Sequence, residues 1–291
     1  MERFYCIVNP IAGSGRAKEQ FIKAYALLTA SGATCEAVYT EYPGHARELA
    51  QKAYDSGERT IVSVGGDGTN QEVGSTLSLT DAKLGILPFG TGNDFARVLK
   101  IPQDVEASVG ILLRGNTKRI DAAMANERFF LNVAGFGFDA EVVRYTEKYK
   151  KRFNGMLPYL MGIFKALTHL KPIEIEVEAD GERFHERAIL ISACNGTHLA
   201  GGMHVAPLAD PCDGLFDFCV VKDMSVFTFL TILPRYIKGK HLDSPHIRYF
   251  KAEGAKINCE SGNVLNLDGE LGEQTPVTFS ILKGALNVFV P

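Results

Sequence analysis

The 291-residue sequence lacks the features that mark membrane, secreted and repeat proteins. It has no run of about eighteen apolar residues, which is the length that a membrane-spanning helix requires. Its N-terminus shows no signal-peptide pattern, because the apolar stretch at residues 4–8 is too short. Internal repeats and low-complexity linkers are also missing. These absences predict a cytoplasmic protein without a transmembrane segment.

The sequence also lacks a large excess of charge of either sign. Its formal net charge is −3, so no global electrostatic attraction to nucleic acid is expected. The six cysteines include no Cys-x-x-Cys pair and mostly lie in strand-like apolar runs, which is typical of reduced, buried thiols. The composition, 46% hydrophobic and 22% charged, indicates a globular protein with one large or two modest domains.

The most informative segment is the turn Gly-Gly-Asp-Gly-Thr at residues 65–69. The β-branched run before it predicts a buried strand, and Val73 and Leu77 after it have the spacing of a helix face. A strand, a glycine turn and a helix start present free N–H groups at one point, which suits a phosphate. Asp67 would repel that phosphate unless a cation lay between them. The motif therefore indicates nucleotide phosphates with Mg²⁺, the alternative being a turn without a ligand.

Two further turns of this kind follow predicted strands. Residues 88–96 are glycine-rich and lead into a helix, with Asn93 or Asp94 as candidate N-cap. Residues 9–15 connect the first strand to a clearly amphipathic helix. Three such loops at the carboxyl ends of parallel strands would line one crevice, where open α/β folds bind their ligands.

These motifs resemble the catalytic domain of the diacylglycerol kinase family, which contains bacterial lipid kinases, sphingosine kinases and ceramide kinases. The first glycine motif is shared with NAD kinases, whereas the second, at residues 90–96, is more specific to lipid kinases. The resemblance covers nearly the whole chain in the family's order. The other segments that match the family are Asn9-Pro10 with Gly13 and Gly15, Thr40-Glu41 with residues 44–46, Asp121, residues 132–137, Pro207 with Asp213-Gly214, and residues 267–270.

The resemblance implies an ATP site with its Mg²⁺ in the first part of the chain. The residues that it implies are Asn9, Gly13, Thr40, Gly65, Gly66, Asp67, Gly68, Thr69, Asn70, Thr91 and Asn93. Arg16 and Lys18 would offset phosphate charge or are simply solvated residues of a helix. Gly13 and Gly15 do not begin a dinucleotide fingerprint, because Lys18 stands where the third glycine is required.

The resemblance also implies a general base at Asp268, which would accept the proton of a lipid hydroxyl. Such a carboxylate contributes about 10²–10⁴ in rate. Asp121 and Glu270 are implied as further carboxylates of the same site. From the residues alone, the Asp-Gly-Glu segment is more typical of a hairpin tip, and Asp121 of a strand-end cap.

A structural Mg²⁺ is implied at Asp213, which precedes a glycine in a tight loop. In the similar bacterial kinases this aspartate coordinates the ion together with backbone carbonyls on either side, which correspond here to Asp210 and Leu215. Oxygen ligands of this kind suit a hard cation. Asp210 departs from the usual residue at its position, and a plain hairpin turn is the alternative.

The chain is expected to form two domains with the chemistry in the cleft between them. The first, residues 1–120 with a returning strand at about 285–291, is an α/β domain with a parallel sheet, similar to NAD kinases and diacylglycerol kinases. The second, residues 121–284, is a mostly antiparallel β-sandwich, since Ile173, Ile175 and Val177 alternate with glutamates. The expected helices are 16–30, 46–56, 70–77, 93–99, 105–114, 139–153 and 157–170. The expected strands are 4–8, 35–40, 60–64, 83–87, 128–134, 173–178, 188–194, 215–221, 247–250, 255–259, 277–282 and 285–290.

The predicted function is an ATP- and Mg²⁺-dependent lipid kinase, most directly one that converts diacylglycerol to phosphatidic acid. An NAD kinase or another small-molecule kinase is the enzymatic alternative, and a non-catalytic nucleotide-binding regulator is the other. A lipid substrate requires a membrane surface, and basic residues beside apolar ones at 148–153 and 227–240 predict transient peripheral association. Solvated helix faces explain both runs equally well. An exposed strand edge in the second domain would permit a homodimer.

Overall fold

The computed structural model describes residues 2–150, 152–153, 157–259 and 262–291. The chain forms two compact units. One contains the chain up to Ala122 together with Lys283–Pro291, and the other is Ala123–Leu282.

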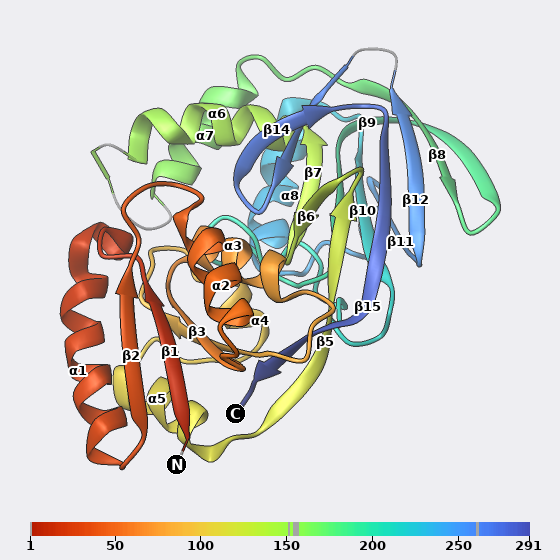
Figure 1. The fold of residues 1–291 in the computed structure, drawn as a ribbon. Helices are drawn as coiled ribbons and strands as arrows, with labels where there is room; N and C mark the ends of the chain where they lie inside the picture. Colours follow the sequence, from red (N-terminus) through yellow and green to blue (C-terminus); the bar gives the residue numbers. More distant parts are fainter. Residues whose placement is uncertain (1, 151, 154–156, 260–261) are drawn as a thin grey trace. The chain divides into compact units, whose positions relative to one another are not determined.

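The first unit is built on a parallel sheet with the strand order β2-β1-β3-β4, to which the end of β15 is added in parallel beside β4 (Figure 1). Its strands are β1 (Arg3–Val8), β2 (Thr34–Tyr39), β3 (Thr60–Gly65), β4 (Lys83–Pro88), the start of β5 (Thr117–Ala125) and the end of β15 (Val277–Phe289). Its helices are η1 (Ala12–Gly15), α1 (Arg16–Ala30), α2 (His45–Asp55), α3 (Asp67–Leu77), α4 (Asp94–Val98) and α5 (Val105–Arg114).

The burial of these strands explains the parallel arrangement. β1, β3 and β4 are buried along nearly their whole length, as strands covered on both faces must be, whereas β2 at the sheet edge is partly exposed. Helix α1 packs with α5, and α2 packs with α3. This confirms the predicted α/β class of the first unit.

Helix α3 begins three residues earlier than the predicted 70–77. Asp67 therefore lies in the first turn of the helix and not in the preceding loop. The pattern of apolar residues could not show this, because the first turn of α3 carries no periodic apolar side chain before Val73.

The second unit is antiparallel and β-rich. Its strands follow the order β14-β13-β7-β9-β8-β12-β15, β10 lies between β9 and β11, and β6 pairs with β5. The strands are β6 (Arg128–Phe130), β7 (Val133–Gly137), β8 (Ile173–Ala179), β9 (Glu182–Cys194), β10 (Phe216–Lys222), β11 (Ile247–Ala252), β12 (Gly254–Cys259), β13 (Val264–Leu267) and β14 (Glu270–Gln274). The helices are α6 (Phe138–Lys150), α7 (Leu157–Leu167) and α8 (Val226–Ile237).

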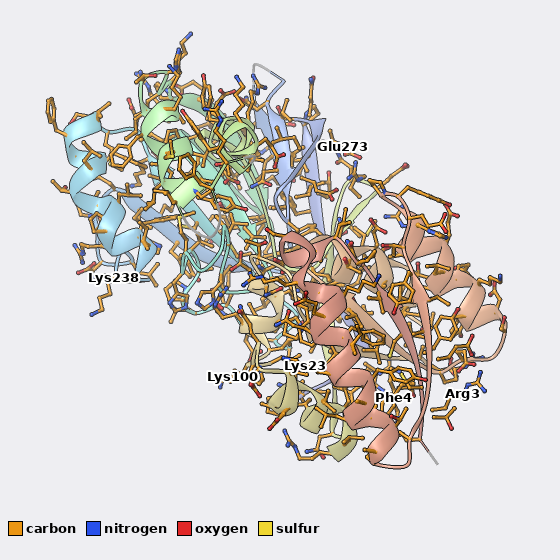
Figure 2. All side chains as sticks on the ribbon, turned by 90° about the vertical axis from the view of Figure 1, so that its left-hand side faces the viewer. Arg3, Phe4, Lys23, Lys100, Lys238 and Glu273 are labelled. Carbon is orange, nitrogen blue, oxygen red and sulfur yellow. The ribbon has the colours of Figure 1, made fainter. Side chains whose placement is uncertain are left out.

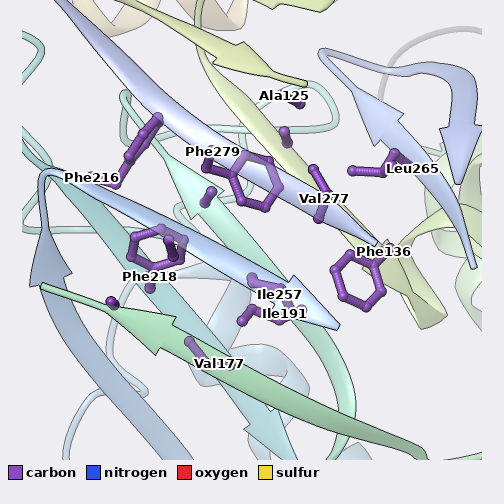
Figure 3. Packing of buried hydrophobic residues seen from close by; sticks show 14 of the residues in the cluster. Ala125, Phe136, Val177, Ile191, Phe216, Phe218, Ile257, Leu265, Val277 and Phe279 are labelled. Atoms are coloured by element: carbon purple, nitrogen blue, oxygen red, sulfur yellow. The ribbon is translucent and has the colours of Figure 1, made fainter. Parts of the chain in front are cut away.

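Phenylalanine side chains dominate the core inside these strands (Figure 3). The rings of Phe130 and Phe216 stack with their centroids 6.0 Å apart, and Phe279 meets both rings close to edge-on. A second apolar cluster lies under α6, α7 and α8. Among the described residues, no helix is long and apolar enough to cross a membrane.

Three expectations for the second unit need correction. The predicted strand 128–134 is two strands, β6 and β7, interrupted at residues 131–132. The predicted strands 277–282 and 285–290 are one strand, β15. Helix α8 and the strands β13 and β14 were not among the expected elements, although a hairpin tip between these two strands was one reading of the Asp-Gly-Glu segment. Of the run 148–153, Lys151 and the side chain of Lys150 lie outside the described residues.

Candidate functional site

The glycine loops of the first unit lie together at the carboxyl edge of its sheet. The backbone N–H of Asn9 donates to the Val64 carbonyl at 2.9 Å, and the Asn9 side-chain amide donates to the Thr69 hydroxyl at 3.2 Å. The N–H of Thr40 donates to the Val8 carbonyl at 2.9 Å, which places Thr40 beside Asn9. These contacts bring together residues that the sequence assigned to one nucleotide site.

This edge is also where the strand order reverses. β1 and β3 are neighbours, and the chain continues outward from them in opposite directions, to β2 and to β4. Ligands of open α/β sheets bind in the crevice at such a switch point. The hydrogen bond between Asn9 and Thr69 spans this point, so the loop residues lie where the fold favours a ligand.

Glycine allows the loops to approach one another more closely than other residues would. A Cβ atom on Gly90 would lie 2.3 Å from the Cα of Gly66, and one on Gly13 would lie 2.4 Å from the Phe89 carbonyl oxygen. Both distances are far inside van der Waals contact. The backbone N–H groups of the loops are therefore brought within a space that side chains would otherwise fill.

Asp67 connects the first glycine motif to the second. Its Oδ1 accepts a hydrogen bond of 3.1 Å from the backbone N–H of Phe95, at the start of α4. Burial raises the pKa of Asp67, although the backbone N–H groups of α4 and the charge of Arg97 oppose this effect. A partly buried carboxylate at a phosphate-type turn is a suitable ligand for a cation that also contacts phosphate oxygens.

Other predicted residues of this site shape the loops themselves. The buried Asn93 side chain donates to the Gly90 carbonyl at 2.9 Å and accepts from its N–H at 3.1 Å. The buried Asn70 accepts a hydrogen bond of 2.8 Å from Ser63. Thr91 and Gly68, by contrast, are exposed.

Two charged residues that order these loops were missed by the sequence interpretation. Arg97 pairs with Asp94 and donates to the Gly92 carbonyl at 3.3 Å, so its guanidinium lies beside the second motif. The Glu72 carboxylate accepts from the N–H groups of Gly44 and Ala46, at 2.9 and 3.0 Å. The position of each, within one helical turn of a glycine motif, was the available signal.

In the second unit, Asp268 occupies the tip of the β13–β14 hairpin. Asp268 and Gly269 both have positive φ, 51° and 97°, as a two-residue hairpin turn requires. The hairpin expectation is therefore confirmed for the backbone.

The side chain of Asp268, however, is bound by three backbone N–H groups. Its Oδ2 accepts from Leu131 at 2.7 Å, and its Oδ1 accepts from Asn132 at 3.0 Å and Val133 at 2.9 Å. Three such donors compensate the charge of a carboxylate and fix its orientation. They also explain why β6 and β7 are separate strands, since these N–H groups turn toward Asp268 and not toward a neighbouring strand.

The two further predicted carboxylates differ in their surroundings. Asp121 is buried in β5 of the first unit and accepts a hydrogen bond of 2.7 Å from the N–H of Gly284 in β15. Glu270 is exposed at the start of β14 in the second unit. Asp121 thus has a structural contact, and the catalytic role of both residues stays a prediction.

The predicted metal loop already contains a cation, the side chain of Lys251. The Oδ1 of Asp213 accepts from the Leu215 N–H at 3.0 Å, and its Oδ2 lies 2.8 Å from the Lys251 ammonium. The Oδ1 of Asp210 accepts from the Cys212 N–H at 3.1 Å. Within the described ranges, no group of three or more histidine, cysteine or acidic side chains could hold a metal ion.

The second unit also contains an apolar cavity under α6, α7 and α8, with about 570 Å³ of empty space when its open mouth is included. Three polar side chains reach it, those of Asp139, Ser192 and Tyr236. The apolar lining consists of Phe138, Val142, Ile163, Leu190, Leu199, Met203, Val205, Val221, Phe229, Ile232 and Leu233.

The polar end of this cavity is linked to the Asp268 hairpin. The Asn266 side chain donates to Asp139 at 2.8 Å and accepts from the Gly269 N–H at 2.9 Å. Burial raises the pKa of Asp139 to about 6, and the hydrogen bond from Asn266 opposes this shift. The arrangement joins a mostly apolar space to the turn that carries Asp268.

Comparison with known proteins gives matches over the whole chain. The model of the diacylglycerol kinase catalytic domain matches residues 3–125, and that of the YegS C-terminal NAD kinase beta sandwich-like domain matches residues 132–290. A curated diacylglycerol kinase of Bacillus subtilis (strain 168) is 31% identical over 294 residues, covering 100% of this chain and 97% of the relative. One of Staphylococcus aureus (strain bovine RF122 / ET3-1) is 30% identical, covering 100% and 93%.

Solved structures agree with these relatives. A crystal structure of a diacylglycerol kinase from Bacillus anthracis strain Sterne has a TM-score of 0.78 at 25% identity and covers 100% of this chain and 97% of its own. A second structure from the same organism has a TM-score of 0.84 at 27% identity, with the same coverage. The similarity thus extends over both units, and it confirms the predicted fold class.

Proposed function

The chain belongs to the diacylglycerol kinase family and is a phosphotransferase with an alcohol group as acceptor, and we propose that it transfers the γ-phosphate of ATP to the hydroxyl of diacylglycerol. The product is phosphatidic acid. The family implies ATP as the phosphate donor and a lipid as the acceptor. We assign nucleotide binding to the first unit and lipid binding to the second.

The observation that supports a lipid acceptor is the cavity of the second unit. Its walls are apolar apart from three polar side chains at Asp139, Ser192 and Tyr236. Burial of apolar surface stabilises binding by about 25 cal/mol for each Å². Contact with these apolar walls therefore contributes more binding free energy for an acyl chain than for a sugar or a nicotinamide. The polar side chains are suited to hydrogen bonds with the glycerol part of the lipid.

We also propose that Mg²⁺ binds with ATP at the glycine loops. The residues fit this ion, because the Asp67 carboxylate lies among backbone N–H groups and a dianionic phosphate there requires a positive charge between them. Asp67 and the Thr69 hydroxyl would hold the ion. It would neutralise the charge that develops on the transferred phosphoryl group.

Asp268 is proposed as the general base. In the transfer step, the lipid hydroxyl oxygen forms a bond to the γ-phosphorus, the bond between that phosphorus and the bridging oxygen breaks, and ADP leaves. The hydroxyl proton passes to Asp268. The N–H groups of residues 131–133 hold the carboxylate in one orientation, so it requires little reorganisation when the hydroxyl arrives.

We propose that α8 touches the membrane during turnover. Phe227, which is 83% exposed, and Leu230 lie on its outer face, while Phe229 and Leu233 line the cavity. Lys238 projects from the end of this helix (Figure 2). An apolar side chain with adjacent basic residues favours an anionic bilayer surface.

Vesicle co-sedimentation tests this membrane contact. Phe227→Asp should lower the fraction bound to vesicles containing phosphatidylglycerol by roughly 10-fold, because a buried phenylalanine contributes about 1.5–3 kcal/mol. Ile22→Asp, which changes an equally apolar exposed residue of the first unit, is the matched control. Equal binding of the two variants would contradict a role for α8.

The homodimer stays a prediction. Among the described residues of the second unit, β6, β11 and β14 each pair with only one strand. Sedimentation velocity at micromolar concentration tests it. A single species with the mass of one chain, 31.8 kDa, would contradict it.

The assay of the proposed function uses γ-labelled ATP, Mg²⁺ and mixed micelles, each containing one lipid alcohol. The panel contains diacylglycerol, phosphatidylglycerol and a sphingoid base, and a separate reaction contains NAD. Label in phosphatidic acid is the expected result. Label in another lipid would correct the acceptor and retain the reaction class, whereas label in NAD alone would contradict a lipid acceptor.

A further inference from the structure

We propose that the ammonium of Lys251 takes the place of the structural Mg²⁺ expected at Asp213, so that the second unit is stable without a divalent ion in this loop. The inference concerns the folding of the unit and does not depend on which lipid is phosphorylated. It predicts a kinase whose only divalent-ion requirement lies with its nucleotide.

The ammonium of Lys251 has three oxygen neighbours. Its Nζ lies 2.8 Å from Oδ2 of Asp213, 3.1 Å from Oδ2 of Asp217 and 3.3 Å from the carbonyl oxygen of Leu208. A lysine ammonium has three N–H donors and no acceptor, which matches this set. Two carboxylates and one carbonyl from separate positions of the chain are thus joined through one positive charge.

Strand pairing fixes the position of this charge. Lys251 in β11 is the direct partner of Asp217 in β10, so the backbone register places the two side chains side by side. Asp217 is fully buried, and its Oδ1 also accepts a hydrogen bond of 2.7 Å from the Tyr249 hydroxyl. A carboxylate at such a position requires a fixed positive partner, and Lys251 supplies it within the fold.

The donor set around Asp213 does not fit a divalent ion as well. Its Oδ1 is bound by the Leu215 N–H and its Oδ2 by Lys251. The carbonyl of Asp210 accepts a hydrogen bond of 3.2 Å from the Asp213 N–H. Mg²⁺ requires oxygens at about 2.0–2.1 Å in octahedral geometry, and a second positive charge at Oδ2 would be repelled by the ammonium.

The ammonium therefore performs the task of the ion, which is to hold the loop against the sheet. The segment that precedes β10 contains Leu208, Asp210 and Asp213. Lys251 connects this segment to β11 at two points, the Leu208 carbonyl and the Asp213 carboxylate. Because lysine is part of the chain, this connection cannot be removed by a chelator or diluted.

The test is thermal unfolding of the nucleotide-free protein in EDTA and in 5 mM MgCl₂ at equal ionic strength. The wild type should unfold at the same temperature in both. Lys251→Met keeps the length of the side chain and removes its charge, and it should lower the midpoint in EDTA by about 5 °C. Mg²⁺ should recover part of this loss, since the two carboxylates then lack a cation.

Two variants serve as controls. Lys256→Met replaces an exposed lysine of β12, the next strand along the chain, and should change neither the midpoint nor its response to Mg²⁺. Lys251→Arg preserves the charge, so its unfolding midpoint should not depend on Mg²⁺. This variant still tests the proposal if Lys251→Met fails to fold.

Two results would overturn the proposal. One is a wild-type midpoint that rises with Mg²⁺ and loses this response in Asp213→Asn but not in Asp67→Asn, which would place an ion in the loop beside Lys251. The other is a Lys251→Met protein with no loss of stability, or with a loss that Mg²⁺ does not reduce. Neither result depends on lipid kinase activity, so the proposed function is tested separately.

Discussion

The candidate site of the first unit depends mainly on closely spaced backbone, and that of the second unit depends mainly on side chains. In the first unit, the loops after β1, β3 and β4 approach one another closely because glycine leaves out the side chains that would separate them. In the second unit, the site depends on side chains: Asp268 held by three N–H groups, Asp139 at the end of an apolar cavity, and Lys251 between two carboxylates.

This difference has a chemical reason. Phosphate groups are alike in every nucleotide, so a rigid backbone cradle serves them without adjustment. A lipid offers little polarity, and a cavity that accepts it must be shaped by apolar side chains from several elements. The first unit should therefore be intolerant of any added side chain in its loops, and the second should respond to changes of shape and charge inside the cavity.

The largest expected effect comes from Asp268→Asn. The carboxamide keeps the shape of the side chain but is a poor base, so turnover should fall by about 10²–10⁴. The unfolding temperature, measured alongside, should fall by a few degrees. One oxygen still accepts from Asn132 and Val133, but the amide nitrogen leaves the Leu131 N–H without an acceptor, which costs about 1–3 kcal/mol. Asp180→Asn alters the tip of another Asp-Gly hairpin, between β8 and β9, and should change turnover little. Near-normal turnover of Asp268→Asn would exclude it as the base.

Gly90→Ala should weaken ATP binding by roughly 10-fold or more, since overpacking of this kind costs about 1–3 kcal/mol and here displaces the loop at Gly66. The KM for ATP is the measurement. Gly110→Ala is the control, because Gly110 lies within helix α5 and a Cβ there would lie 3.4 Å from the end of the flexible Arg114 side chain. An unchanged KM for ATP in Gly90→Ala would show that the close approach of the two loops is not needed for the nucleotide.

Leu233→Trp should shift the preference toward short acyl chains by about 10-fold in the ratio of kcat/KM values, because a few methylenes in an apolar pocket contribute about 1–3 kcal/mol. Leu233 lines the cavity, whereas Leu230 lies on the outer face of the same helix. Leu230→Trp should therefore leave the chain-length profile unchanged. The same shift in both variants would contradict a role for the cavity in lipid binding.

The smallest expected effect concerns Asp139. Its pKa of about 6 in the folded protein lies above its ordinary value of 3.8, so folding favours the protonated form. The protonated Asp139 carboxyl group makes its full contribution to the free energy of unfolding below about pH 4, and this contribution is lost as the pH rises through 6. Asp139→Asn lacks this loss and should unfold about 4 °C higher than the wild type at pH 7.5 and at the same temperature at pH 4. A gain of equal size at both pH values would contradict this explanation.

The first unit could largely be predicted from its sequence. The predicted helices 16–30 and 105–114 agree with α1 and α5, and Gly115 ends α5 in the left-handed conformation that favours glycine. Periodicity and glycine are local signals, and in a parallel sheet the carboxyl ends of neighbouring strands must meet. For this reason three separate glycine motifs sufficed to predict that their loops lie together, and the nucleotide site that they would form stays a prediction.

The second unit was less predictable because its decisive contacts are distant in the sequence. The N–H groups that hold Asp268 belong to residues 131–133, and Lys251 is 38 residues from Asp213. No pattern in either segment indicates its partner. Helix α8 shows the same limit: Phe229, Ile232, Leu233 and Tyr236 have the spacing of one helix face, but only the fold shows that this face lines a cavity.

The most direct test of this division between the units compares the KM for ATP and the KM for diacylglycerol in Gly90→Ala and Leu233→Trp. The account predicts that the first variant raises the KM for ATP and the second raises the KM for long-chain diacylglycerol, each with little change in the other constant. Parallel changes of both constants in both variants would contradict it.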